Sequence, residues 1–255
     1  MSAGLVVNAD DLGRTIGINE GIFTAHRHGL VSSATLMVGF PAARDAARAL
    51  ADHPALGVGL HVTLTGAEPT LPAAEVPSLV DGAGRLARKP ELIGAPDPDE
   101  LLAEIRHQLE IFVSLVGRLP THLDSHHHSH RHPAVLDALT LVARTHRLPV
   151  RRSSEAIAAR LAGEGLATTD RFVERFFDSA ATLPVLHEIL RDAAAAGGTT
   201  EVMCHPGHPD DALRRESGYA EAREREIAVL CDPSARALAD ELGLRRLRFD
   251  QACGS

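Results

Sequence analysis

Residues 5–13 read LVVNADDLG, an apolar run that ends in two adjacent carboxylates, Asp10 and Asp11, followed by a glycine two residues later. The pattern predicts a buried strand with acidic side chains at its carboxyl end. Apolar runs of this kind recur along almost the whole chain and alternate with amphipathic stretches of helical period. This alternation predicts repeated β-α units arranged around a mainly parallel sheet or barrel.

The expected strands are short apolar runs bounded by turn residues. They cover residues 5–9, 34–38, 57–64, 121–124, 149–152, 201–204 and 247–249, and residues 171–177 fit either a strand or a helix. Capping residues and a 3.6-residue period predict the helices. These open at Asp97-Pro98, Pro133 and Asp232-Pro233 and also cover residues 17–28, 42–51, 154–161, 184–196 and 219–230. We interpret the charged run at residues 214–226 as a solvated helix face.

Composition excludes several classes of protein. The chain has 255 residues, and its 26 basic side chains against 34 acidic ones give a net charge of −8, which disfavours a nucleic-acid partner. The apolar stretches are too short and too interrupted to predict a membrane span or a secretion signal. Three cysteines without metal-finger spacing indicate a reduced, cytoplasmic enzyme. We expect one domain over residues 1–255.

One segment interrupts the alternation. Residues 66–97 are rich in glycine and proline and show neither a strand nor a helix pattern. Long irregular segments inside a domain are uncommon and tend to be lids or binding loops, with disorder as the alternative. We interpret residues 66–97 as a lid-like insertion over the active-site face.

Histidine is the compositional outlier, with 15 residues against one tyrosine and no tryptophan. Six of the histidines lie within residues 122–132, HLDSHHHSHRH, and well-patterned sequence flanks the run on both sides. A polar solvated loop is one interpretation of this run. A metal site is the other, because neutral imidazole is the commonest protein ligand for transition metals.

Acids and imidazoles fall at or near the carboxyl ends of successive predicted strands, where β/α folds build their active sites. Taken singly, an Asp-Asp pair fits a helix cap, and a histidine in an apolar strand fits a hydrogen-bonded core residue. Taken together, Asp11, His61 and a histidine of residues 126–128 supply the two imidazoles and one carboxylate that leave open positions on a divalent metal. His205 follows the strand at 201–204 and suits a general acid.

Four motifs together resemble the YdjC/ChbG family of carbohydrate deacetylases, which remove acetyl groups from N-acetylated sugars such as chitooligosaccharides. They are NADD at residues 8–11, GLH at 59–61, PTHLDSHHH at 120–128 and EVMCHP at 201–206. The resemblance implies a (β/α)-barrel-like fold related to the TIM barrel. It also implies one divalent metal ion per chain, Zn²⁺ or Mg²⁺, with Mn²⁺, Co²⁺ or Fe²⁺ as options, and a homodimer as one oligomeric option.

The resemblance also implies roles for individual residues. The metal ligands would be Asp11, His61 and His126, although His127 or His128 could replace His126. Asp10 would be the general base, and a protonated His205 would be the general acid. The residues expected around them, in contact with the ligands or the substrate, are Asp124, which would orient a ligand imidazole, and His127, His128, His130 and His208.

The scarcity of aromatic residues limits the expected substrate, because sugar sites commonly stack pyranose rings on aromatic faces. The chain has no Trp, seven Phe and one Tyr, Tyr219. A mono- or disaccharide, or a sugar on a lipid or other small aglycone, therefore fits better as the substrate than a long chitin-like chain bound in a groove. Two other functions remain. One is another metal-dependent amidohydrolase or phosphoesterase of barrel fold, and the other is a histidine-rich metal-binding protein.

Overall fold

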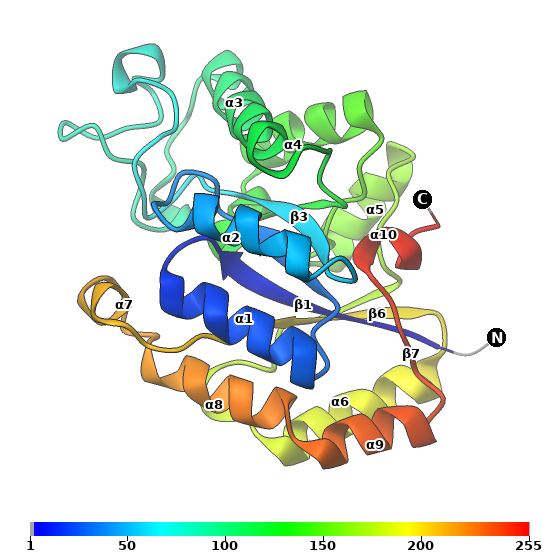
Figure 1. The fold of residues 1–255 in the computed structure, drawn as a ribbon. Coiled ribbons are helices and arrows are strands. Elements are labelled where there is room, and N and C mark those ends of the chain that lie inside the picture. Colours follow the sequence, from blue (N-terminus) through cyan, green and yellow to red (C-terminus); the bar gives the residue numbers. More distant parts are fainter. Residues whose placement is uncertain (1–2, 255) are drawn as a thin grey trace.

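The computed structural model describes residues 3–254, the side chain of Glu216 excepted, and is built around a curled parallel sheet (Figure 1). The sheet runs in the order β4-β3-β2-β1-β6-β5, and β7 pairs with β1. The strands are β1 (Gly4–Leu12), β2 (Ser33–Leu36), β3 (Gly57–Val62), β4 (Leu123–Ser125), β5 (Arg171–Val173), β6 (Thr199–Cys204) and β7 (Arg245–Arg246). The expected α/β, barrel-like architecture is confirmed.

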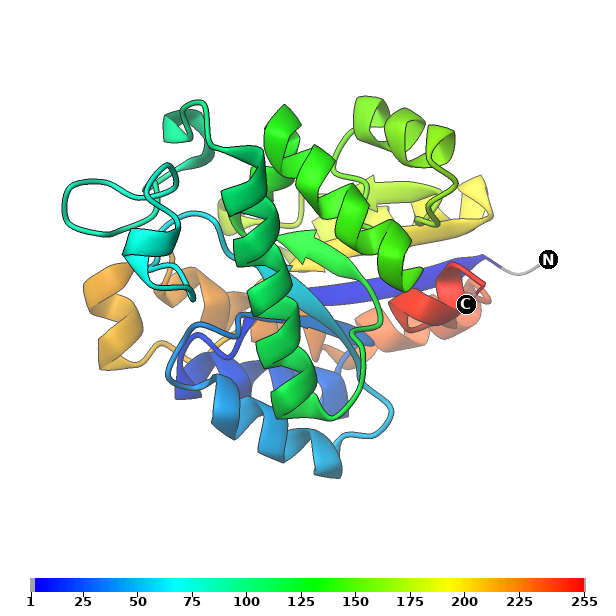
Figure 2. The ribbon, with the colours of Figure 1, turned by 90° about the horizontal axis from the view of Figure 1, so that it is seen from above.

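Helices cover the outside of the sheet (Figures 1 and 2). They are α1 (Ile16–His28), α2 (Ala43–Ala49), α3 (Pro98–Val116), α4 (Pro133–His146), α5 (Glu155–Gly163), α6 (Leu183–Ala196), α7 (Asp211–Glu216), α8 (Glu221–Leu230), α9 (Pro233–Glu241) and α10 (Phe249–Ala252). Short 3₁₀ turns are η1 (Leu50–Asp52), η2 (Ala73–Glu75), η3 (Pro90–Leu92), η4 (His126–Arg131) and η5 (Asp178–Ala180). In residues 3–254 no helix has the length and apolarity needed to cross a membrane.

Helix α3 shows how local sequence sets an element. The Asp97 side chain accepts hydrogen bonds from the backbone N–H groups of Asp99 and Glu100, and Pro98 occupies the first turn. Gly117 ends the helix in the left-handed conformation, where a glycine carries no steric penalty. The buried face contacts the core through Leu101, Ile105, Leu109 and Phe112. The helix predicted from the cap and the apolar stripe is therefore confirmed.

Two of the expected strands differ from the structure. Residues 247–249 are not a strand, because Arg245 and Arg246 pair with β1 and Phe249 begins α10. The Phe249 ring stacks on His122 with centroids 3.9 Å apart. This apolar residue is therefore buried by side-chain packing and not by pairing in the sheet. Residues 149–152 form only an isolated bridge from Val150 to Leu123. Residues 171–177, which fitted either element, provide the short strand β5.

The two ends of the sheet differ in what surrounds them (Figure 1). Residues 66–97 and α7 lie beyond the carboxyl ends of the strands, whereas α10 lies near the amino end of β1. Residues 66–97 contain η2, η3 and an antiparallel bridge between Val80 and Leu86. That residues 66–97 act as a lid stays a prediction. A single domain over residues 1–255 also stays a prediction.

Glycine at position 21 lets α1 approach the backbone of the segment after β6. A Cβ at Gly21 would lie 2.5 Å from Gly207 Cα, a contact that real Cβ atoms do not make. Gly21→Ala should lower the free energy of unfolding by about 1–3 kcal/mol, because the neighbouring atoms are backbone and cannot rotate away. Urea unfolding measures the change.

The matched control for Gly21 is Gly163→Ala in α5, where an added Cβ meets no atom within 4 Å. This change should leave the protein as stable or raise its stability by up to about 1 kcal/mol. Equal behaviour of the two variants would contradict the role given to Gly21.

Candidate active site

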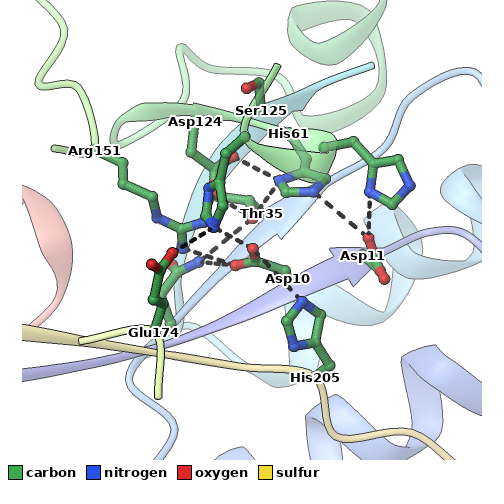
Figure 3. Close-up of polar contacts among 12 residues, drawn as sticks. Asp10, Asp11, Thr35, His61, Asp124, Ser125, Arg151, Glu174 and His205 are labelled. Atoms are coloured by element: carbon green, nitrogen blue, oxygen red, sulfur yellow. Dashed lines mark hydrogen bonds and ion pairs between the residues drawn. The ribbon is translucent and has the colours of Figure 1, made fainter. Parts of the chain in front are cut away.

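An irregularity in β1 separates the two adjacent carboxylates. The register between β1 and β2 shifts between Ala9 and Leu12, and Asp11 adopts a left-handed φ of 69°. A bulge of this kind re-aims the side chains on its strand. Asp10 contacts Arg151, while Asp11 faces His61 (Figure 3). The two acids therefore enter different sets of contacts.

Arg151 is a fully buried cation that joins three carboxylates. Its guanidinium donates to both oxygens of Asp10 at 2.7 Å, to Asp124 Oδ2 at 2.8 Å and to Glu201 Oε1 at 2.7 Å. Burial alone would raise the pKa of Asp10, but the Arg151 charge outweighs it and holds that pKa well below its usual range. Asp10 is therefore ionised near neutral pH. Residues 149–152 were predicted only as a strand, so Arg151 was missed; two adjacent arginines in a predicted strand were the available signal.

Asp11, His61 and His126 converge at the carboxyl ends of β1, β3 and β4. Asp11 Oδ1 lies 3.5 Å from His61 Nε2 and 3.0 Å from His126 Nδ1, and all three residues are buried. Within residues 3–254, neither of these two ion-pair contacts of Asp11 Oδ1 has regular hydrogen-bond geometry. A buried carboxylate oxygen facing two imidazole nitrogens matches the donor set that divalent transition metals take in proteins.

Asp124 fixes the orientation of the His61 ring. His61 and Asp124 are direct partners in the β3–β4 register, and His61 Nδ1 lies 2.7 Å from Asp124 Oδ1. Thr35 donates to the other oxygen of Asp124 at 3.1 Å (Figure 3). Because Nδ1 faces Asp124, Nε2 is the nitrogen directed towards Asp11. Such a carboxylate-histidine pair is the usual support of a metal-binding imidazole.

The charge balance around His61 favours a cation. Burial alone would lower its pKa, but the carboxylates of Asp124, Asp11 and Asp10 outweigh burial and raise the pKa of His61 to about 10. The site thus attracts positive charge, and binding a metal there requires His61 to lose a proton.

A second group of potential ligands, Asp10, His61 and Asp124, overlaps the first. Its members are already bound to one another or to Arg151: Asp10 and Asp124 both pair with that guanidinium, and His61 Nδ1 contacts Asp124. A buried cation already balances these carboxylates, so this group behaves as a hydrogen-bonded support. The geometry therefore favours one metal position, at Asp11.

The histidine run forms a tight turn rather than an open chelator. His127 and His128 adopt left-handed φ angles of 54° and 51° inside η4, a conformation uncommon outside glycine. The turn directs His126 towards Asp11 and buries His130, whose Nδ1 lies 2.5 Å from Ser125 Oγ. Because His126 contacts Asp11 and His130 is buried against Ser125, the run does not present its rings together to solvent, which disfavours the metal-sequestering function.

His205 lies on the opposite side of Asp10 from Arg151 (Figure 3). Its Nε2 is 4.0 Å from Asp10 Oδ2, and its backbone N–H donates to Glu226 Oε2 at 2.5 Å. Burial lowers the pKa of His205 to about 4 despite the nearby Asp10. Desolvation therefore favours a neutral ring near pH 7, and the role of His205 as general acid stays a prediction.

Two members of the charged run at residues 214–226 are buried, which corrects its interpretation as a wholly solvated face. Arg223 donates to Asp11 Oδ2 at 2.5 Å, and Glu226 accepts from the His205 backbone and from the Tyr219 hydroxyl. Both residues lie on the inner side of α8, with 2 % and 0 % of their surface exposed. The mixed charges along the helix gave no sequence signal that Arg223 and Glu226 are buried, and only the packing of α8 on α1 identifies them.

A cleft of about 510 Å³ opens over these groups. His127 and His128 line it together with Asp10, Asp11, His61, His126 and His205, whereas Asp124 and His130 lie behind it. His208 lies apart, half-exposed, and pairs with Glu224 at 2.8 Å. Residues 66–97 contribute Arg88, Lys89, Pro90 and Glu91 to the lining.

The acid-imidazole cluster at the carboxyl ends of parallel strands places the chain among enzymes of the β/α-barrel type. It belongs to the YdjC-like protein family, whose model matches residues 4–241, which confirms the resemblance in its motifs.

A carbohydrate deacetylase of Geobacillus stearothermophilus is 41% identical over 96% of both chains. A chitooligosaccharide deacetylase of Serratia marcescens is 36% identical over 94% of this chain and 95% of its own. An Enterococcus faecalis V583 crystal structure, given a provisional role in cellobiose-phosphate cleavage, superposes with a TM-score of 0.93 at 30% identity and covers 99% of this chain and 100% of its own.

Proposed function

We propose that the protein is a metal-dependent carbohydrate deacetylase that hydrolyses the N-acetyl group of an amino sugar or a small glycoconjugate to acetate and a free amine. One observation carries the proposal. Asp11 Oδ1 faces one nitrogen each of His61 and His126 in a cleft, beside a separately held pair, Asp10 and His205. The names of the curated relatives support the same reaction class.

Asp11, His61 and His126 would hold the ion, Zn²⁺ or Mg²⁺, because their donor atoms lie together and Asp124 and Arg223 orient two of the three side chains. When bound, a divalent ion would supply Lewis acidity: it would polarise the acetamide carbonyl and lower the pKa of a bound water to about 7.

Asp10 takes the proton of the attacking water in this mechanism. Arg151 keeps the carboxylate ionised, and Arg151 together with Asn8 Nδ2, 2.9 Å from Asp10 Oδ1, fixes its orientation. Asp10 Oδ2, 4.0 Å from the imidazole of His205, is the oxygen on the His205 side. A positioned base of this kind contributes about 10²–10⁴-fold to rate.

His205 returns that proton to the departing nitrogen. Because its ring is neutral at rest, it must first receive the proton from Asp10, from which it is 4.0 Å away. The proton count then balances: one proton leaves water, passes through Asp10 and His205, and ends on the amine. Glu226 holds the His205 backbone in place for the transfer.

Acetate release is the direct test of the proposed reaction. The purified protein is incubated with N-acetylglucosamine, its dimer and lipid-linked N-acetylated sugars, with and without a chelator. We expect acetate and a free amine in equal amounts, and loss of the reaction when the chelator removes the metal. A chelator-insensitive reaction, or none with any of these substrates, would refute the proposal.

His61→Ala should remove the metal and lower acetate release by at least about 10³-fold, because the loss of one ligand leaves only two in place. Elemental analysis of the purified variant measures the metal, and the assay above measures the rate. His146→Ala, an exposed histidine at the end of α4, is the matched control and should behave as the unmodified protein. Unchanged metal content in His61→Ala would exclude His61 from the ligand set.

Another barrel-type amidohydrolase or a phosphoesterase is the rival function. Such enzymes usually assemble two or three metals, whereas Arg151 already balances the second group of carboxylates here. A metal content near one ion per chain favours the deacetylase.

A further inference from the structure

Exposed aromatic surface is scarce in this protein. Among the Phe and Tyr side chains of residues 3–254, Phe177 alone is exposed, at 42 %, whereas the others are buried or half-buried. Its exposed ring lines the catalytic cleft rather than an outer surface. A single exposed apolar residue needs no explanation by itself, but its place among charged and polar groups in a cleft does.

The backbone around Phe177 holds its ring in the cleft. Phe176, its neighbour, is fully buried, and Asp178, the next residue, adopts a left-handed φ of 52°. The Asp178 N–H donates to the Tyr219 hydroxyl at 2.8 Å, and Arg225 donates to the Asp178 carbonyl at 3.1 Å. An anchored neighbour on each side therefore fixes the position of Phe177.

Tyr219 supports the ring of Phe177 directly. The two rings are stacked with centroids 4.3 Å apart and planes 10° apart. The Tyr219 hydroxyl also donates to Glu226, which accepts the backbone N–H of His205. One residue pair, Tyr219 and Glu226, thus positions both the exposed ring and the proposed acid.

Phe177 lies next to the reacting groups. Its ring meets His205 edge to face, with centroids 5.4 Å apart, and Glu174 and Met203 line the same cleft. A flat molecule that lies against the Phe177 ring therefore also lies next to the His205 imidazole, which faces Asp10. Two charged side chains also line the same cleft: Arg88, and Glu174, which pairs with Arg131.

We propose that Phe177 is the platform on which one pyranose ring of the substrate stacks, and that it selects an N-acetylated hexosamine over acyclic acetamides. This inference rests on the proposed deacetylase function. The apolar C–H face of a pyranose covers an aromatic ring without losing the hydration of its equatorial hydroxyls. Because no other Phe or Tyr ring among residues 3–254 is exposed, we expect the platform to serve one sugar unit, which agrees with a mono- or disaccharide substrate.

A fluorescence experiment tests the platform without relying on turnover. The chain has no tryptophan, so Phe177→Trp places a single indole in the cleft. Titration with N-acetylglucosamine should shift and quench the emission in a saturable way. Leu141→Trp on α4, where Leu141 is also 42 % exposed but lies outside the cleft, is the matched control and should not respond.

Kinetics supply the second readout. Phe177→Ala should raise KM for N-acetylglucosamine about 5- to 10-fold with kcat within about twofold, because stacking is lost equally from the bound sugar and the transition state. Phe177→Tyr should restore KM, since it keeps the ring.

The two proposals fail in different ways. A saturable response of Phe177→Trp without acetate release would retain the platform and refute the deacetylase. Acetate release with a silent Phe177→Trp and an unchanged KM in Phe177→Ala would refute the platform and retain the deacetylase.

Discussion

Replacing Arg151 with methionine is expected to lower the free energy of unfolding by about 3–5 kcal/mol at pH 7, because it leaves Asp10, Asp124 and Glu201 buried without their shared cation. The three carboxylates would then have raised pKa values in the folded protein. A group with a raised folded pKa stabilises the fold at low pH and loses that contribution as the pH rises through its folded value. The deficit of Arg151→Met should therefore shrink between pH 7 and pH 5, as measured by urea unfolding at each pH.

Arg160→Met is the matched control for Arg151, because it removes the same group from an exposed site where Arg160 pairs with Asp137 and Glu164. Water screens such pairs, so the unfolding midpoint should hardly change. A small loss of stability in Arg151→Met, independent of pH, would show that the three carboxylates do not need the guanidinium.

Asp10→Asn is expected to reduce acetate release by about 10²- to 10⁴-fold while the metal content stays near that of the unmodified protein. The amide keeps the shape of the carboxylate but cannot accept the proton of the attacking water, which is the share of a general base. Asp11 and the two histidines are untouched, so metal binding should persist. Parallel measurement of acetate, bound metal and circular dichroism separates loss of the base from loss of the site.

The surface pair of His208 and Glu224 offers a control for Asp10→Asn. His208→Ala removes an imidazole close in sequence to His205 but outside the cleft, and acetate release should be unchanged. Asp10→Asn with activity within tenfold of the unmodified protein would show that another group takes the proton.

The sequence predicted much of the fold because its signals are local. The cap at Asp97-Pro98 and the alternation of apolar runs with amphipathic stretches depend on neighbouring residues, and both match the structure. The short strands at 149–152 and 247–249 were wrong because pairing depends on distant partners: Arg151 pairs with the carboxylates, and Phe249 stacks on His122.

The residues of the site likewise fall into two groups: those that the sequence predicted and those that only the structure identified. Asp10, Asp11, His61, His126 and His205 were visible because acids and imidazoles at strand ends are a sequence pattern, and the structure brings them together. Arg223 and Phe177 were not visible. An arginine in a charged helix and a phenylalanine after a short strand have no local feature that marks them as parts of a cleft.

The sequence by itself determined the alternating elements, the family motifs and the acids and imidazoles available for chemistry, because these follow from residue type and spacing. Only the tertiary structure decided which charges are buried and which groups face one another. Burial sets the neutral state of His205 and the ionised state of Asp10, and the packing of α8 brings Arg223 to Asp11. These properties depend on desolvation and on contacts between distant residues, which no local pattern records.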